Sequence, residues 1–123
     1  EIDAYYREQL AHVPGITCLP QGHQTVANHS YFPILIGPEY PLSRDALYEK
    51  LKENGIYARR YFYPLISDFP MYKSLPSSTA ETVKEAKASA ANVLCLPIFP
   101  ALTPADQNKI LYTIKNINQK ENA

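Results

Sequence analysis

Residues 29–36 read His-Ser-Tyr-Phe-Pro-Ile-Leu-Ile, and this stretch decides the fold that we expect for the chain. Successive side chains of a strand point to opposite faces. The apolar side chains fall on both faces, with Phe32, Ile34 and Ile36 on one and Tyr31, Pro33 and Leu35 on the other. The pattern therefore predicts a strand that is covered on both sides. Because Pro33 cannot donate a hydrogen bond, it favours an edge strand or a bulge.

Helices are predicted on both sides of this strand. Apolar spacing and end signals indicate helices at 2–12, 44–53 and 79–91, and a last helix that begins at Thr103-Pro104. Ser43 and Thr103 are expected to be N-caps, and Ser78 with Glu81 is expected to form a capping box.

Further extended segments are expected at 16–19, 56–63 and 92–96. Helices and strands then alternate along the chain. This order predicts an α/β (α+β type) single domain over residues 1–123, with a small, mostly antiparallel sheet of three to four strands packed with helices.

The composition excludes several classes of protein. Twelve Lys+Arg balance 12 Asp+Glu, which argues against a strongly basic nucleic-acid binder or a polybasic membrane-surface protein. No apolar run approaches the roughly 20 residues that a membrane span needs. Cys18 and Cys95 could pair as a disulfide, but a single pair is not a framework, and we expect a reducing, cytoplasmic setting. We expect no metal site, because no close-pair ligand spacing occurs among His12, Cys18, His23, His29 and Cys95.

Residues 57–64, Tyr-Ala-Arg-Arg-Tyr-Phe-Tyr-Pro, hold the densest group of candidate binding residues. If the segment is extended, two faces result: Tyr57, Arg59, Tyr61 and Tyr63 on one, and Arg60 and Phe62 on the other. A guanidinium beside phenols suits an anionic ligand such as a phosphate or carboxylate. From residue types alone, a structural interpretation is favoured, in which the arginine stems cover an aromatic core and their heads lie in solvent.

His29, Ser30 and Tyr31 open the central strand and form a second candidate site. A histidine at a strand end can bond a ligand oxygen or pass a proton. The alternative is a partly buried histidine that is satisfied by backbone groups. The lysines fall mostly on solvated helix faces, so the chain shows no complete catalytic apparatus and no Schiff-base lysine.

The run from Asn54 to Leu65, together with Tyr72 and Leu94–Thr103, resembles the C-terminal domain of the DegT/DnrJ/EryC1/StrS sugar aminotransferases, which depend on pyridoxal 5'-phosphate (PLP). The His29–Ile34 and Arg44–Leu47 stretches follow the same order. The Arg-Arg-Tyr-Phe-Tyr-Pro variant looks most like members that act on nucleotide-linked, particularly dTDP-linked, keto-deoxysugars. Where many relatives carry a histidine after the Pro-Leu step, this chain has Leu65-Ile66-Ser67-Asp68.

The resemblance implies the small domain of a fold type I transferase, whose large domain would carry the Schiff-base lysine and hold PLP. The intact enzyme would be a homodimer that moves an amino group, from a donor such as glutamate, onto a keto sugar. The implied substrate-binding residues are His29, Ser30, Tyr31, Arg59, Arg60, Tyr61 and Tyr63.

Two alternatives of other classes stay open at this point. One is a stand-alone RNA-binding α/β module, because aromatic strands can stack bases. The other is a pure dimerisation domain. Since the chain opens with Glu1 and its only methionine is Met71, we expect an excised domain or a processed product.

Overall fold

The computed structural model describes residues 1–22, 26–61 and 63–117, so His23 and Phe62 lie outside the described part. Its elements follow in chain order: α1 (Ile2–Leu10), β1 (Ile16–Cys18), β2 (Phe32–Ile36), α2 (Arg44–Glu53), the 3₁₀ turns η1 (Ile66–Asp68) and η2 (Pro76–Ser78), α3 (Lys84–Asn92), β3 (Val93–Leu96) and α4 (Pro104–Lys115). The predicted fold class is confirmed, because these helices accompany a three-stranded antiparallel sheet.

β2 is the central strand of the sheet, in the order β1-β2-β3, so the prediction that Pro33 marks an edge or a bulge was wrong. The register explains how the proline is accommodated. Pro33 lies opposite Cys95, whose own N–H and carbonyl group both bond Arg59 on the far side of β3. β1 ends at Cys18, opposite Ile34, and so does not reach Pro33. The missing N–H therefore removes no ladder hydrogen bond.

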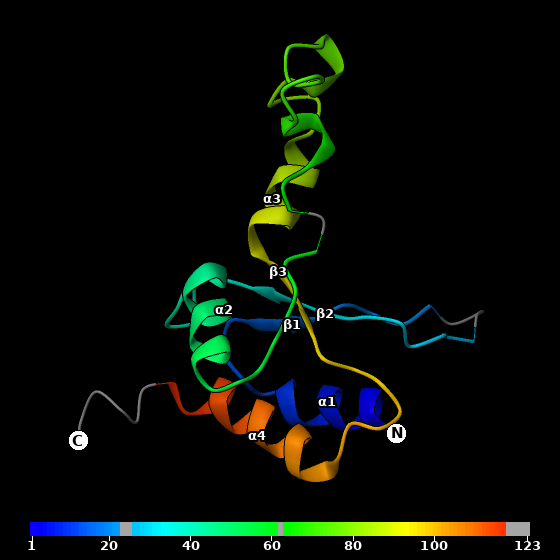
Figure 1. The fold of residues 1–123 in the computed structure, drawn as a ribbon, viewed down its shortest axis with the longest axis vertical. Coiled ribbons are helices and arrows are strands. Elements are labelled where there is room, and N and C mark those ends of the chain that lie inside the picture. Colours follow the sequence, from blue (N-terminus) through cyan, green and yellow to red (C-terminus); the bar gives the residue numbers. More distant parts are fainter. Residues whose placement is uncertain (23–25, 62, 118–123) are drawn as a thin grey trace.

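The core lies between the sheet and the helices α1, α2 and α4. Figure 1 shows α1 and α4 side by side below the sheet, and both α1 and α2 contact α4. The largest fully buried side chains come from every layer: Tyr6, Leu10, Phe32, Ile34, Leu47, Leu51, Leu94 and Ile114. The two predicted caps hold the helices α2 and α4 at their first turns, since Ser43 and Thr103 accept hydrogen bonds from the N–H groups of Ala46 and Asp106.

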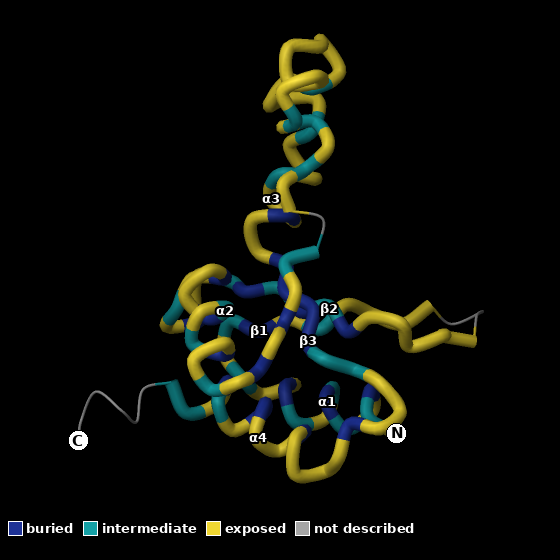
Figure 2. The backbone as a smooth tube through the Cα atoms, in the orientation of Figure 1, coloured by how far each residue is buried: buried dark blue, intermediate teal, exposed yellow. Residues whose placement is uncertain are grey.

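Residues 64–92 project from this core as an arm that carries η1, η2 and α3 (Figures 1 and 2). Most of the arm is exposed, and α3 buries only Ala90 at its root. The predicted helix at 79–91 therefore begins later, at Lys84, and Ala80 is exposed rather than inward. The Ser78–Glu81 capping box does not cap α3, whose N-cap is Val83 without a side-chain hydrogen bond.

Contrary to the prediction, the described residues of 56–63, which exclude Phe62, form no strand. Among them, only Arg59 pairs with β3, through two backbone hydrogen bonds of 3.0 and 2.8 Å to Cys95. β3 has only four residues, and the chain turns at Tyr61. The carbonyl oxygen of Val93, where this ladder would continue, instead accepts a hydrogen bond of 3.1 Å from Nη1 of Arg44.

Candidate functional site

His29, Ser30 and Tyr31 lie in the loop that leads into β2, not in the strand itself, which begins at Phe32. All three are exposed. His29 has a positive φ of 52°, an uncommon conformation for a residue with a β-carbon. The structure thus turns this short stretch outward, where its side chains are open to a ligand.

Tyr31 meets Tyr61 from the second predicted stretch. Their ring centroids lie 5.1 Å apart at an interplanar angle of 57°. Arg59, two residues before Tyr61, is exposed, and its backbone is hydrogen-bonded to Cys95 of β3. The fold therefore brings one residue of each predicted group into ring contact, the exposed Tyr31 and the half-buried Tyr61, with the exposed Arg59 two positions away along the chain. We call Tyr31, Arg59 and Tyr61 the aromatic face.

Arg60 and Tyr63 lie elsewhere, against α2. The Arg60 guanidinium stands 4.8 Å from the ring centroid of Tyr48 and 4.6 Å from that of Tyr63. Its Nη1 atom also lies 3.4 Å from Oδ1 of Asp45. The strict alternation expected for an extended segment would have placed Tyr63 with Arg59. Instead, the turn at Tyr61 brings Tyr63 beside Arg60.

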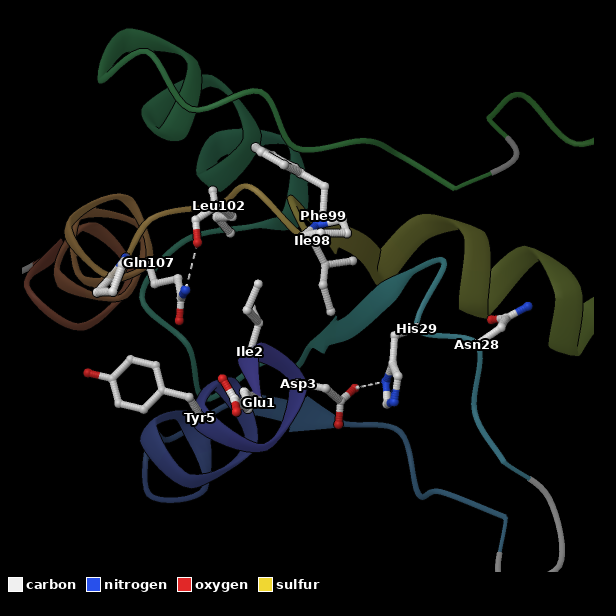
Figure 3. Close-up of a pocket in the computed structure, with 12 residues that line it drawn as sticks. Glu1, Ile2, Asp3, Tyr5, Asn28, His29, Ile98, Phe99, Leu102 and Gln107 are labelled. Carbon is white, nitrogen blue, oxygen red and sulfur yellow. Dashed lines mark hydrogen bonds and ion pairs between the residues drawn. The ribbon is translucent and has the colours of Figure 1, made fainter.

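A buried carboxylate, Asp3 of α1, lies next to His29. The Asp3 side chain is 9% exposed, and its Oδ2 atom is 3.6 Å from Nδ1 of His29 (Figure 3). Its Oδ1 atom accepts hydrogen bonds of 2.7 Å from Nε of Arg7 and from Nε2 of Gln21. This arrangement differs from the structural interpretation of His29, because the neighbouring group is a carboxylate rather than a backbone group.

Asp3 and His29 both line an open cavity of about 680 Å³, bounded by the start of α1, the loop before β2 and the β3–α4 connection. Figure 3 shows Ile98, Phe99 and Leu102 across the opening from α1. One wall is thus apolar, while the other carries the carboxylate–imidazole pair. A mixed lining of this kind suits a small polar molecule with an apolar side.

Sequence reasoning missed Asp3 and Phe99. A signal for Asp3 existed, since it precedes Tyr6 and Leu10 by three and seven positions and so falls on the buried stripe of α1. An acid on a buried helical face needs a partner, which points to a polar network. Phe99 carried no such signal, because it follows β3 in a loop whose path depends on the tertiary fold.

The described residues offer no group of three or more histidine, cysteine or acidic side chains that could hold a metal ion. Both cysteines are free thiols, and burial raises the pKa of Cys95, partly offset by the nearby Arg59 charge. No helix in the described ranges is long and apolar enough to cross a membrane.

Two curated relatives of this chain are transaminases with the same name. The chain is 50% identical over 101 residues to a dTDP-4-amino-4,6-dideoxy-D-glucose transaminase of Escherichia coli, covering 82% of this chain and 27% of that protein. It is 42% identical over 115 residues to the Shigella dysenteriae transaminase of the same name, covering 94% of this chain and 31% of that protein. The chain thus spans less than a third of the length of these curated relatives.

A solved structure agrees. The crystal structure of DesI in the presence of its TDP-sugar product superposes with a TM-score of 0.74 at 25% identity, covering 99% of this chain and 32% of that one. The family model described as the DegT/DnrJ/EryC1/StrS aminotransferase family matches residues 1–115. The chain therefore belongs to the DegT/DnrJ/EryC1/StrS aminotransferase family.

Proposed function

We propose that this chain is the small C-terminal domain of a PLP-dependent aminotransferase that transfers an amino group to a nucleotide-linked keto-deoxysugar, with dTDP as the nucleotide. The observation that carries the proposal is the 50% identity to the E. coli transaminase, over 82% of this chain. Glutamate is the proposed amino donor. We further propose a cytoplasmic homodimer as the working form of the intact enzyme.

The aromatic face is the proposed contact for the nucleotide-sugar. Arg59 is exposed and can donate paired hydrogen bonds to a phosphate. Tyr31, which is exposed and whose ring contacts that of Tyr61, adds aromatic surface from the loop before β2. We propose that His29 and Ser30 approach the same substrate from the adjoining loop. Arg60 and Tyr63, which contact α2, are proposed to support this surface at the contact between domains.

The residues of this chain do not fit PLP as its principal holders. A lysine that forms an imine with the cofactor reacts as the neutral amine. It therefore needs an apolar setting, which disfavours the charged form. Every lysine among the described residues is exposed or half-buried: Lys50, Lys52, Lys73, Lys84, Lys87, Lys109 and Lys115. We therefore propose that the cofactor is bound by the part of the longer protein that this chain does not include.

Kinetics of the full-length aminotransferase test the role of the aromatic face. Arg59→Ala should raise KM for the nucleotide-sugar by about tenfold or more, because a charged hydrogen bond is lost. The content of bound PLP should stay unchanged. Lys52→Ala, which removes an exposed charge from α2, is the matched control and should leave KM near the wild-type value. An unchanged KM in Arg59→Ala contradicts the proposed contact.

Incubation of the 123-residue chain with PLP tests where the cofactor is held. After borohydride reduction, mass spectrometry should find no stoichiometric adduct on any one lysine. A single fully modified lysine would show that this domain holds the cofactor itself and would refute the assignment of PLP to the longer protein's other part.

A further inference from the structure

We propose that Asp3 is a positioning residue for His29. Its carboxylate holds the proton of the neutral imidazole on Nδ1, so that Nε2 is presented as a hydrogen-bond acceptor to a hydroxyl group of the sugar. The identity of this ligand rests on the proposed function. The pairing of the two side chains rests on the structure alone.

The two oxygen atoms of the Asp3 carboxylate contact different residues. Oδ1 accepts both strong hydrogen bonds, from Nε of Arg7 and from Nε2 of Gln21, each 2.7 Å long. Oδ2 faces Nδ1 of His29 at 3.6 Å. With one oxygen atom held by two donors, the orientation of the carboxylate is fixed, and so is the direction in which Oδ2 points.

The same network closes the base of the loop between β1 and β2. On the outgoing limb, Nη1 of Arg7 donates to the carbonyl oxygen of Leu19 at 2.6 Å, and Gln21 bonds Asp3. On the returning limb, His29 faces Asp3. One buried residue of α1 therefore contacts both limbs, and it fixes where His29 leaves the loop.

The backbone of His29 supports a functional interpretation. At φ 52° it is the only described residue other than glycine with a positive φ. Such a conformation is unfavourable for a residue with a β-carbon, and it persists only where the surroundings impose it. Figure 3 shows the imidazole of His29 directed at the carboxylate of Asp3.

The chemistry follows from what a carboxylate can do. At 3.6 Å the contact between Oδ2 and Nδ1 is electrostatic and longer than a hydrogen bond. A negative carboxylate at this distance favours the tautomer that carries hydrogen on Nδ1, because the other tautomer would turn a lone pair toward a negative charge. A neutral imidazole has one N–H, which leaves Nε2 with its lone pair. The side chain is 49% exposed, so Nε2 is reachable by a ligand. A sugar hydroxyl, which can donate, is the matching group.

The substitution Asp3→Asn is a sharp test, because it should reverse the tautomer. Arg7 and Gln21 both donate, so they keep the amide oxygen in the place of Oδ1. The amide nitrogen then faces His29 and donates to Nδ1, which moves the imidazole proton to Nε2. Glu8→Gln, at an exposed acid of the same helix, removes the same charge and is the control.

The measurement is the tautomer of His29, from long-range ¹H–¹⁵N correlation spectra of the 123-residue chain at about pH 8.5, where an ordinary imidazole is neutral. His29→Gln assigns the signals. The Nδ1–H form should dominate in the wild type and in Glu8→Gln, and become the minority in Asp3→Asn. A wild type in which Nε2–H dominates overturns the proposal, and it does so even if Asp3→Asn fails to fold.

Kinetics of the full-length aminotransferase distinguish the positioning role of Asp3 from the substrate role of His29. Asp3→Asn and His29→Gln should each lower kcat/KM by about tenfold, and the double variant should be no worse, because both changes break one unit. If only His29→Gln lowers kcat/KM, the positioning role of Asp3 is refuted while the proposed site stands. If the tautomer reverses but neither variant affects kcat/KM, the proposed substrate role of His29 is refuted.

Discussion

The Arg44 guanidinium donates a hydrogen bond of 2.6 Å from Nη1 to the carbonyl oxygen of Ala90, 46 positions later in the chain. The same Nη1 atom lies 3.1 Å from the carbonyl oxygen of Val93. Arg44 itself is buried. One side chain at the start of α2 therefore satisfies the carbonyl groups where α3 ends and β3 begins, and it attaches the root of the arm to the core.

Removing this guanidinium should destabilise the domain. Arg44→Met keeps most of the side-chain volume but leaves two buried carbonyl groups without their donor, at a cost of about 2–4 kcal/mol in the free energy of unfolding. Urea unfolding measures this free energy. Lys52→Met, at an exposed position of the same helix, should change it by less than about 0.5 kcal/mol. Equal stability of Arg44→Met and wild type would show that the carbonyl groups do not depend on Arg44.

Gly15 and Gly55 allow two costs of an added β-carbon to be compared: the strain of a left-handed backbone and the clash with neighbouring atoms. Both have positive φ, 79° and 74°. A β-carbon at Gly15 would lie 2.1 Å from the backbone nitrogen of Tyr40, whereas at Gly55 the nearest atom is Nζ of Lys109 at 3.9 Å. Gly55→Ala should therefore cost about 1–2 kcal/mol, the price of the left-handed conformation alone.

Gly15→Ala should cost clearly more, because the backbone at Tyr40 must also move. We expect an additional loss of at least about 2 kcal/mol, and thermal unfolding of both variants measures the difference. If both alanine variants lose the same stability, the close approach between Gly15 and Tyr40 is not a constraint on the fold.

Local signals predicted the helices whose ends carry a cap. Ser43 and Thr103 are N-caps as expected, and α2 spans the predicted residues 44–53. A cap is a contact between residues three positions apart, so the sequence contains all of its information. The start of α3 was misplaced because it depends on tertiary burial, and Ala80 on the projecting arm has no core to contact.

The sequence predicted which stretches supply the candidate site residues, but not which of these residues contact one another. The stretches 29–31 and 57–64 were both identified, yet nothing in either predicts that Tyr31 meets Tyr61 while Arg60 contacts Tyr48. These contacts depend on the turn at Tyr61 and on the single backbone pairing of Arg59 with Cys95. The pairing does not continue along β3, where the Val93 carbonyl oxygen is bonded by Arg44, and periodicity does not reveal such a tertiary contact.

Stability should fall in alkaline solution because two tyrosines are buried as neutral hydrogen-bond donors. Oη of Tyr40 donates to the carbonyl oxygen of Ile114 at 2.7 Å, and Oη of Tyr6 donates to that of Pro97 at 2.9 Å. Burial raises the pKa of both phenols above the ordinary value, and the Asp106 charge adds to the effect at Tyr6. The folded state thus keeps protons that the unfolded state releases.

The sign of the effect follows from this difference. The stabilisation is complete below the unfolded pKa of about 10 and is lost as the pH rises toward the higher folded pKa, by up to about 1.4 kcal/mol per pH unit for each phenol. Urea unfolding between about pH 8 and 11 should show the decline, and Tyr40→Phe should reduce its slope. Tyr112→Phe, at an exposed tyrosine, is the control and should not. An unchanged slope in Tyr40→Phe contradicts the assignment.

Substitutions of Arg60 and Arg59, neighbours in sequence, should have different effects: the first on stability and the second on binding of the proposed substrate. Arg60 lies between the rings of Tyr48 and Tyr63 with Asp45 nearby, and its side chain is 34% exposed. Arg60→Met should therefore lower the free energy of unfolding by about 1 kcal/mol, the scale of a cation–π contact at a partly exposed position. A double-mutant cycle with Tyr48→Leu should give a coupling of about 0.5 kcal/mol or more.

The same variants in the full-length aminotransferase complete the comparison. Arg59→Ala should raise KM for the proposed nucleotide-sugar more than Arg60→Met does. Arg59 is exposed, whereas the Arg60 guanidinium already contacts two rings and a carboxylate. Arg60→Met should in turn lower the melting temperature more than Arg59→Ala. The reverse order in both measurements would place Arg60, rather than Arg59, at the substrate.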